Sequence, residues 1–311
     1  MSGSTTEVEA PTERLQVQQR RRPVQDRWTP YAFLAPGVAV VVIIMIYPVF
    51  YGVWLSLTET DIFTGVTSFV GAQQYMDLFA QAQFQNALRQ SMILVAGTVI
   101  FGIIVSMSFA LILERAPLGG RVVRTMVLVP WLISGIAVAT IWRAIFSPTG
   151  GFADSVLLFL GLDPITWFGS GFWAMSVIIL VSVWSMSPFS TLILYAGLKT
   201  VNEEMYEAAA IDGAGFFTTF RYITMPSIAP QFALALVFLS FAAFNSFDII
   251  LLATGGGPGR STEVLALLLY RLGFEQLDFH SAAAVMVVLL VINLVLSAIY
   301  LRILPRDEVN S

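Results

Sequence analysis

The segment AAAVMVVLLVINLVLSAIYLRIL, at residues 282–304, carries a single charged residue, Arg302, close to its end. A helix rises about 1.5 Å per residue, so about 20 residues cross the roughly 30 Å hydrocarbon core of a membrane. Because no water reaches that core, the backbone amides and carbonyls must be satisfied within the segment, and an α-helix does this. The segment therefore predicts a transmembrane helix.

Five more segments of this kind precede it, and the composition agrees with them. The chain has 311 residues, of which 57% are apolar and 12% are charged, and its mean hydropathy is +0.79. A soluble domain carries about 25% charged residues, so much of this surface must face lipid. The sequence predicts an all-α polytopic membrane protein with about six transmembrane helices. The five further segments are residues 31–57, 87–113, 122–146, 172–198 and 226–253.

Basic residues predict the orientation, because cytoplasmic loops hold an excess of Lys and Arg. With a cytoplasmic N-terminus, twelve of the sixteen basic residues fall inside. Both termini are therefore expected in the cytoplasm, and the loops near 58–85, 147–171 and 254–281 are expected outside. The inside residues are Arg14, Arg20, Arg21, Arg22, Arg27, Arg115, Arg121, Arg124, Lys199, Arg221, Arg302 and Arg306. The other four are Arg89, Arg143, Arg260 and Arg271.

Three regions follow from this pattern. Residues 1–28 are polar and lack an apolar period, which predicts a disordered cytoplasmic tail. Residues 29–306 form the transmembrane domain, with an inner loop at 199–226, and residues 307–311 form a C-terminal tail. The first span is too long for a cleaved signal peptide and no small-residue cleavage site is evident, so we expect it to be retained.

Several kinds of site are excluded by residue type. The chain has no cysteine and one histidine, His280, so neither thiol chemistry nor a multi-histidine metal site is expected. The net charge of −4 gives no basic surface for nucleic acid. No cluster of catalytic side chains indicates a membrane enzyme, and no set of buried charges indicates a stand-alone ion-coupled carrier. His280 is interpreted as a polar loop residue.

A glycine triplet at residues 255–257 invites comparison with phosphate-binding loops. Such a loop ends in Gly-Lys-Ser or Gly-Lys-Thr on a strand–loop–helix frame. Here Pro258 follows the triplet and a predicted span precedes it. We therefore expect a flexible outer loop that meets a partner. Pro188, inside the fourth predicted span, is either an ordinary membrane-helix proline or a kink that lines a pathway.

The inner loop reads KTVNEEMYEAAAIDGAGFFTTFRYITMP at residues 199–226. Asn202 is a good N-cap, and the two glutamates after it lie where the helix dipole favours them. A short helix is predicted up to about Ile211, followed by a turn at Asp212-Gly213. A second short helix is expected to pack back on the membrane domain through three phenylalanines, Phe216, Phe217 and Phe220.

The tip of this loop presents Glu207, Ala208 and Ala209. Small side chains let another surface approach closely, and a carboxylate beside them can pair with an arginine or a lysine. The loop thus has the character of a docking element. An amphipathic connector lying on the bilayer is the alternative.

The sequence Glu207-Ala208-Ala209, followed by Asp212-Gly213-Ala214, resembles the EAA motif of the membrane subunits of binding-protein-dependent ABC importers. The segment LYAGL at residues 194–198 is similar to a segment that precedes this motif in the family, and TGGGP at residues 254–258 to one that follows the fifth span. The resemblance covers roughly residues 30–304. It points to sugar permeases of the maltose and glycerol-3-phosphate type, and to the first of the two permeases in such importers.

The resemblance implies an ABC importer permease fold in a bacterial or archaeal plasma membrane, and half of a translocation pore. It implies that the loop at residues 203–213 is a coupling helix seated on a cytoplasmic ATPase, with Glu207, Ala208, Ala209, Asp212 and Gly213 at the contact. The expected partners are a second homologous permease, two ATP-binding cassette subunits, an extracytoplasmic solute-binding protein and membrane lipid. ATP and Mg would bind the ATPase, and this chain itself would be neither an enzyme nor a cofactor carrier.

The resemblance implies a carbohydrate cargo, of di- or oligosaccharide size. The spans hold almost no arginine beyond Arg143, which agrees with a neutral sugar because a phosphate-bearing cargo would favour arginines. Glycerol 3-phosphate or another small polar solute is the alternative. Four residues in the fifth span suit a sugar pathway, since aromatic faces pack on sugar C–H surfaces and an amide binds hydroxyls. These are Phe244, Asn245, Phe247 and Asp248. For any single one of them, ordinary interhelical hydrogen bonding and packing is the favoured explanation, and Asp248 could be solvated at a helix end.

Overall fold

The computed structural model describes residues 3, 29–60, 64–115 and 120–303. The predicted tails, residues 1–28 apart from Gly3 and residues 307–311, lie outside the described residues. The chain divides into two compact units, Met1–Val49 and Phe50–Ser311. Each unit is described separately.

The first unit contains α1 (Thr29–Val41), the π-helical segment η1 (Val42–Ile46) and the start of α2 (Tyr47–Leu55). A proline ring clashes with the carbonyl four residues earlier. For Pro48 that residue is Ile44, which lies inside η1, so the wider π-helical turn accommodates the proline. The helical run from Phe33 to Leu55 is long and apolar enough to cross a membrane.

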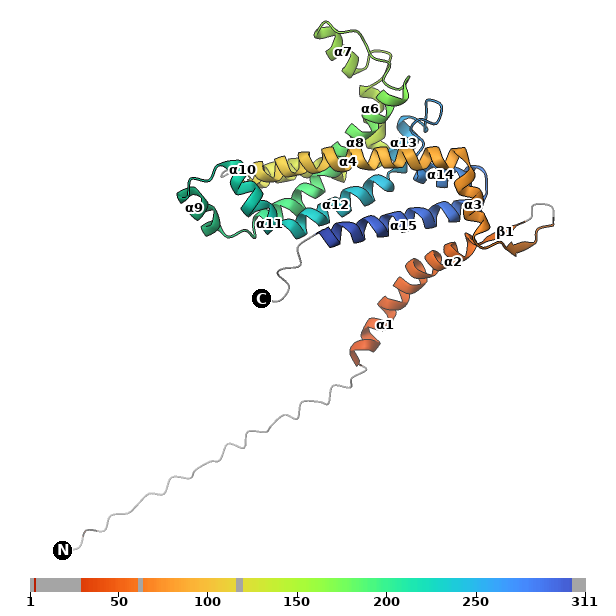
Figure 1. The fold of residues 1–311 in the computed structure, drawn as a ribbon, viewed down its shortest axis with the longest axis horizontal. Helices are drawn as coiled ribbons and strands as arrows, with labels where there is room; N and C mark the ends of the chain where they lie inside the picture. The colour runs from red at the N-terminus through yellow and green to blue at the C-terminus, as the bar shows by residue number, and fades with distance from the viewer. Residues whose placement is uncertain (1–2, 4–28, 61–63, 116–119, 304–311) are drawn as a thin grey trace. The chain divides into compact units, whose positions relative to one another are not determined.

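In the second unit, several helices of one bundle run along a common direction (Figure 1). They are α4 (Ala82–Arg115), α8 (Gly171–Leu198), α12 (Ala229–Phe244) and α15 (Phe279–Ile303). Helix α8 lies against both α4 and α12, and α12 also packs on α15. Helix α8 continues through Pro188 without a break, and it buries residues along its whole length.

One end of the bundle carries the short helices that follow α8. We call residues 199–226 the elbow. It contains α9 (Glu203–Ile211), α10 (Phe216–Thr219), the π-helical segment η2 (Phe220–Thr224) and the start of α11 (Met225–Ser227). Segment η2 includes Tyr222, four residues before Pro226, so the proline is accommodated here in the same way as in η1.

The opposite end of the bundle, which we call the remote end, is built from shorter pieces (Figure 1). They are α3 (Gln73–Ala80), α6 (Gly135–Ile145), α7 (Phe152–Phe159), α13 (Phe247–Ala253), α14 (Leu265–Tyr270) and the π-helical η3 (Arg271–Glu275). A small antiparallel hairpin joins β1 (Thr58–Thr60) to β2 (Thr67–Phe69), with Thr58 opposite Phe69. Helix α5 (Gly120–Leu132) follows α4 in the chain and precedes α6.

The described residues contain four helices that are long and apolar enough to span a membrane, and two bent pairs that qualify together. The predicted count of six holds when each bent pair is one span. The bent pairs are Thr125–Leu132 with Gly135–Ile145, at 96°, and Phe216–Ser227 with Ala229–Phe244, at 78°. All of these candidate spans in the described residues are helical, as the sequence predicts.

However, the prediction of continuous helices over residues 122–146 and 226–253 is wrong. The first breaks at Ser134, whose extended backbone (φ −62°, ψ 144°) lets its hydroxyl accept a hydrogen bond from the Ala137 amide and start a new helix. The second bends at Ile228 and breaks again at Asn245 and Ser246, before α13. Apolar content alone predicts how much chain crosses a membrane, and it does not show where a polar residue restarts a helix.

Candidate functional site

Helix α9 of the elbow begins as the sequence predicts. The Asn202 side-chain oxygen accepts a hydrogen bond from the Glu204 amide at 3.0 Å. This cap satisfies one of the amides that a helix start leaves without a partner. Glu203 and Glu204 lie in the first turn, where the helix dipole favours negative charge. The predicted end of the helix at Ile211 is also confirmed.

Gly213 ends α9 by a Schellman motif. Its φ of +74° is left-handed, a conformation that suits glycine. The Gly213 amide donates to the Ala210 carbonyl at 3.1 Å, and the Ala214 amide donates to the Ala209 carbonyl at 2.9 Å. Open space surrounds the position of a Cβ at Gly213. The glycine is therefore required by the backbone conformation and not by crowding.

The helix and turn orient the five motif residues differently. Glu207, Ala208, Asp212 and Gly213 are exposed, whereas Ala209 is buried. The outward side of α9 thus combines a carboxylate with a small residue, and the turn adds a second carboxylate. Ala209 lies on the side that faces the rest of the chain.

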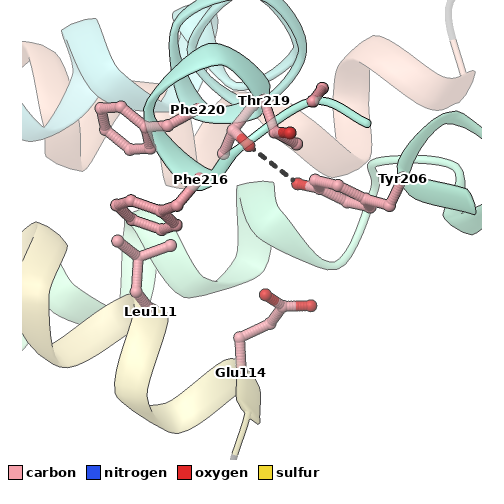
Figure 2. A pocket seen from close by; sticks show the side chains of 8 residues that line it. Leu111, Glu114, Tyr206, Phe216, Thr219 and Phe220 are labelled. Atoms are coloured by element: carbon pink, nitrogen blue, oxygen red, sulfur yellow. Dashed lines mark hydrogen bonds between the residues drawn. The ribbon is translucent and has the colours of Figure 1, made fainter. Parts of the chain in front are cut away.

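Tyr206 anchors the inward side of α9. Its hydroxyl lies 3.1 Å from the Thr224 hydroxyl, so one of them donates to the other. Thr224 is buried in η2. Both residues line a cavity of about 220 Å³. In Figure 2 a dashed line from the Tyr206 hydroxyl marks this hydrogen bond. The bond ties the first helix of the elbow to the segment that leads into α12.

The opposite wall of this cavity comes from α4. Leu111 and Glu114 project from the last turns of α4, and the Phe216 ring from α10 lies beside Leu111 (Figure 2). A second cavity of about 410 Å³ shares Glu114 and Tyr206 with the first. Glu114 also forms an ion pair with Lys199 at 3.8 Å. The elbow therefore rests on α4 and α8 through a partly hollow contact, which the sequence did not predict because its members are far apart in the chain.

The three phenylalanines of the second short helix have different surroundings. Phe220 packs against a buried cluster at the elbow ends of α4, α8 and α12, as predicted. Phe216 is about half exposed at the cavity, and Phe217 is 83% exposed. The prediction that Phe217 packs on the membrane domain is therefore wrong. Exposed Ile211 and Tyr222 add to the apolar surface of the elbow.

The four residues predicted for a solute pathway occur at the break between α12 and α13. Phe244 is 2% exposed and packs in a core cluster with Leu265 and Leu268. Asn245 is exposed, and its amide donates to the Phe241 carbonyl at 2.7 Å. Exposed Phe247 begins an aromatic stack, which continues through the partly buried Tyr270 to the exposed Phe274 with ring centroids 5.5 and 5.4 Å apart. Only Phe244 of the four has its side chain in the core.

Asp248 is half-buried at the start of α13. Its carboxylate lies against Gly135, the first residue of α6, so closely that a Cβ at position 135 would overlap it. Asp248 is thus not simply solvated at a helix end. This contact joins α6 and α13, the two helices that follow the helix breaks.

The loop with the glycine triplet is held by side chains. Arg271 donates to the Gly255 carbonyl and to the Glu263 carboxylate, each at 2.6 Å. Thr262 donates to the Gly257 carbonyl at 2.8 Å. Glu263 is fully buried. The expected flexible loop is therefore wrong, because a buried ion pair fixes it.

His280 is similarly tied into the remote end. Its Nδ1 lies 3.2 Å from the Leu55 carbonyl and 3.1 Å from the Thr58 hydroxyl, and its Nε2 lies 2.8 Å from the Thr60 hydroxyl. It joins α15 to the β-hairpin and is more than a polar loop residue. Within the described residues, no three His, Asp or Glu side chains are grouped to hold a metal ion.

Comparison with known proteins places these features in a family. Residues 102–307 match the family described as binding-protein-dependent transport system inner membrane component. The trehalose/maltose transport system permease protein MalF of Thermococcus litoralis is 33% identical over 88% of this chain and 92% of its own. The sn-glycerol-3-phosphate transport system permease protein UgpA of Escherichia coli is 35% identical over 90% of this chain and 96% of its own.

Solved structures show the same fold. A bacterial ABC transporter involved in the import of the acidic polysaccharide alginate has a chain that superposes with a TM-score of 0.75. That chain is 26% identical, and the match covers 89% of this chain and 96% of the other. An alginate transporter in complex with a periplasmic protein bound to an alginate pentasaccharide gives 0.74 at 23% identity, over 88% and 92% of the two chains.

The family match covers well over half of the chain, and it includes the elbow, the broken spans and the last helix. Subunits of this family are multi-pass inner membrane proteins and have no ATPase activity of their own. The chain therefore belongs to the binding-protein-dependent transport system inner membrane components, as the permease subunit of an ABC importer of the maltose and glycerol-3-phosphate permease type.

Proposed function

We propose that this permease forms half of the translocation pore of an ATP-driven carbohydrate importer and is driven through the loop at residues 203–213. A second homologous permease would complete the pore. Two ATP-binding cassette subunits, holding ATP and Mg, would bind the elbow, and an extracytoplasmic solute-binding protein would deliver the solute. The proposed orientation has both termini and the elbow in the cytoplasm.

The two-sided character of α9 carries this proposal. Its outward side exposes Glu207 and Ala208, and the Gly213 turn exposes Asp212. A partner groove with basic side chains can pair with the carboxylates, and the small residues allow close approach. Exposed Ile211 and Phe217, at 87% and 83%, provide apolar contact area beside them. Large exposed apolar side chains gathered on one surface are typical of a protein or membrane interaction site.

The inward side of α9 supports a mechanical role. The Tyr206–Thr224 bond connects α9 to η2, which continues through α11 into α12. Helix α12 in turn contacts α4, α8 and α15. A displacement of α9 by an ATPase would therefore be passed to the bundle along a hydrogen-bonded and packed route. The cavities beneath α9 leave room for such a displacement.

A neutral sugar suits the remote end better than a phosphate ester does. The exposed Asn245 amide and the stack of Phe247, Tyr270 and Phe274 provide hydrogen-bonding and aromatic surfaces. Two of the arginines at this end already have partners, because Arg271 pairs with the buried Glu263 and Arg143 donates to the Leu252 carbonyl. Glycerol 3-phosphate remains the alternative cargo, and the 35% identical relative UgpA supports it.

Charge reversal at Glu207 tests the coupling. We expect Glu207→Lys to insert normally but to lose copurification with the ATPase and solute-stimulated ATP hydrolysis. Glu207→Gln, which keeps the shape, should have a smaller effect. Asp163→Lys, at an exposed carboxylate in the loop after α7, is the control for charge reversal and should behave as the unmodified chain. Normal assembly and hydrolysis with Glu207→Lys would remove the coupling assignment.

Two measurements separate the candidate cargoes. Titration calorimetry of the solute-binding protein against maltose and against glycerol 3-phosphate shows which class is delivered. Asn245→Ala should then reduce uptake of a delivered sugar at a given concentration of loaded binding protein. If glycerol 3-phosphate alone binds, the carbohydrate proposal fails while the coupling proposal stands.

A further inference from the structure

Helices α6 and α13 lie side by side at the remote end (Figure 1). Two contacts fix their direction. Asp248 of α13 lies against Gly135 of α6, and Arg143 of α6 donates from Nη1 to the Leu252 carbonyl of α13 at 3.1 Å. Later residues of one helix therefore meet later residues of the other. The two helices run parallel.

Parallel neighbours bring helix ends of the same sign together. A helix carries partial positive charge at its N-terminus and partial negative charge at its C-terminus. At the shared N-terminal end, the Asp248 carboxylate lies on the first residue of α6. At the shared C-terminal end, the Arg143 guanidinium bonds one of the last carbonyls of α13. Each charge belongs to one helix and compensates the end of the other.

The interface between these ends is packed. Val138 of α6 and Ile249 of α13 are 1% and 4% exposed, and both belong to one core cluster. At Gly135 a side chain would have to displace the Asp248 carboxylate, since a Cβ there would lie 2.6 Å from the Asp248 Cγ. The pair is thus joined at both ends and along its length.

Interruptions of the helical backbone conformation separate α6 and α13 from the longer helices. Before α6, Ser134 has an extended backbone and α5 meets α6 at 96°. Before α13, Ser246 leaves the helical region with φ −82° and ψ 67°. Both breaks lie next to the Asp248–Gly135 contact in the chain. Backbone torsions at such points can change without disturbing the helices that they connect.

We propose that α6 and α13 form one rigid unit, joined by Asp248 and Arg143, that moves as a single body during the transport cycle. Gly135, Asp248 and Arg143 are positioning residues of this unit. Because Asn245 and Phe247 lie at its edge, the unit also sets where they stand in the solute pathway. This last consequence rests on the proposed carbohydrate pathway, whereas the joint itself does not.

A suppressor experiment tests the contact. Gly135→Ala should lower the thermal unfolding temperature of the purified transporter complex by several degrees, because the methyl group meets the Asp248 carboxylate. Asp248→Gly removes that carboxylate. Gly135→Ala added to Asp248→Gly should therefore cause little further loss. An equal loss from Gly135→Ala in both backgrounds would overturn the contact.

A disulfide tests whether the unit stays closed. The chain has no cysteine, so Gly135→Cys/Asp248→Cys introduces the only pair, and the Cβ at 135 lies within the usual reach of a sulfur at 248. The same sample is compared oxidised and reduced in the assembled transporter, with each single cysteine variant as control. We expect the bond to form and solute-stimulated ATP hydrolysis to be equal in both states.

Two results would overturn the proposal. Failure of the disulfide to form would show that the contact is absent. Loss of stimulated hydrolysis on oxidation, with recovery on reduction, would show that α6 and α13 separate during the cycle. Absence of stimulated hydrolysis in the unmodified chain would count against the proposed function instead, and the suppressor result would still decide the contact.

Discussion

The elbow and the remote end contain short helices of similar length, yet they are held by different means. The elbow is shaped by hydrogen bonds between near neighbours in the chain, namely the Asn202 side-chain cap and the backbone bonds of the Gly213 turn. The remote end is held by side chains from distant parts of the chain, such as Arg143 with Leu252, which are 109 residues apart. One end depends on backbone conformation, and the other depends on paired polar groups.

This difference agrees with the roles that we assign to them. An element that docks on a partner needs a fixed local shape and an exposed face, and it can tolerate cavities beneath it. A set of half-helices within a membrane protein needs internal partners for its charges, because unpaired charge is costly in the membrane. We therefore expect the remote end to be most sensitive to loss of a paired polar group, and the elbow to a change of backbone conformation.

The largest effect is expected at the remote end. Arg271→Ala leaves Glu263 buried without its main partner, and breaking a buried ion pair costs about 3–5 kcal/mol. Glu275→Ala removes the other carboxylate of Arg271, a pair at 3.8 Å with Glu275 half exposed, and should cost about 0–1 kcal/mol. Unfolding temperatures of the two purified variants measure the contrast. Equal shifts would mean that burial of Glu263 does not matter.

A backbone change should damage the elbow next most strongly. Gly213→Pro forbids the left-handed conformation and removes the amide that bonds Ala210, at a local cost of about 3 kcal/mol. We expect normal insertion but lost solute-stimulated ATP hydrolysis. Gly213→Ala keeps the amide and meets no neighbouring atom, so it should cost about 1–2 kcal/mol and retain partial coupling. Full coupling with Gly213→Pro would refute the turn's role.

The smallest effect concerns the bond that joins the elbow to the bundle. Tyr206→Phe removes the hydroxyl that bonds Thr224, a loss of about 0.5–1.5 kcal/mol. We expect less solute transported per ATP hydrolysed, with assembly unchanged. Thr224→Val and the double variant complete a double-mutant cycle. Additive effects of the two substitutions would show that the bond does not transmit motion.

The sequence predicted the elbow well because its signals lie within a few residues. A cap residue at 202, two glutamates and an Asp-Gly turn are sufficient to bound α9. The resemblance then assigned five contact residues, of which Ala209 is buried and faces inward. Tyr206–Thr224, eighteen residues apart, was missed. The only available signal was that Tyr206 precedes Glu207 and so points elsewhere on the helix.

The remote end was predicted poorly because the contacts that hold it join residues that are far apart in the chain. Hydropathy predicted the spans, but Ser134 restarts a helix by its backbone conformation, which apolar content does not reveal. The partners of Asp248, Arg271 and His280 are defined only when the chain has folded. Flexibility was expected of the glycine-rich loop from its composition, although a buried pair outside the triplet fixes it.

Cysteine protection tests the central claim, that the outward side of α9 is where the ATPase binds. In the cysteine-free background, Ala208→Cys introduces an exposed thiol on α9, and Ser155→Cys introduces one on α7. Labelling by a water-soluble maleimide is compared with and without the ATPase subunits. We predict that the ATPase protects the thiol at 208 and leaves the thiol at 155 reactive. Equal labelling at 208 with and without the ATPase, in a complex shown to be assembled, would contradict the account.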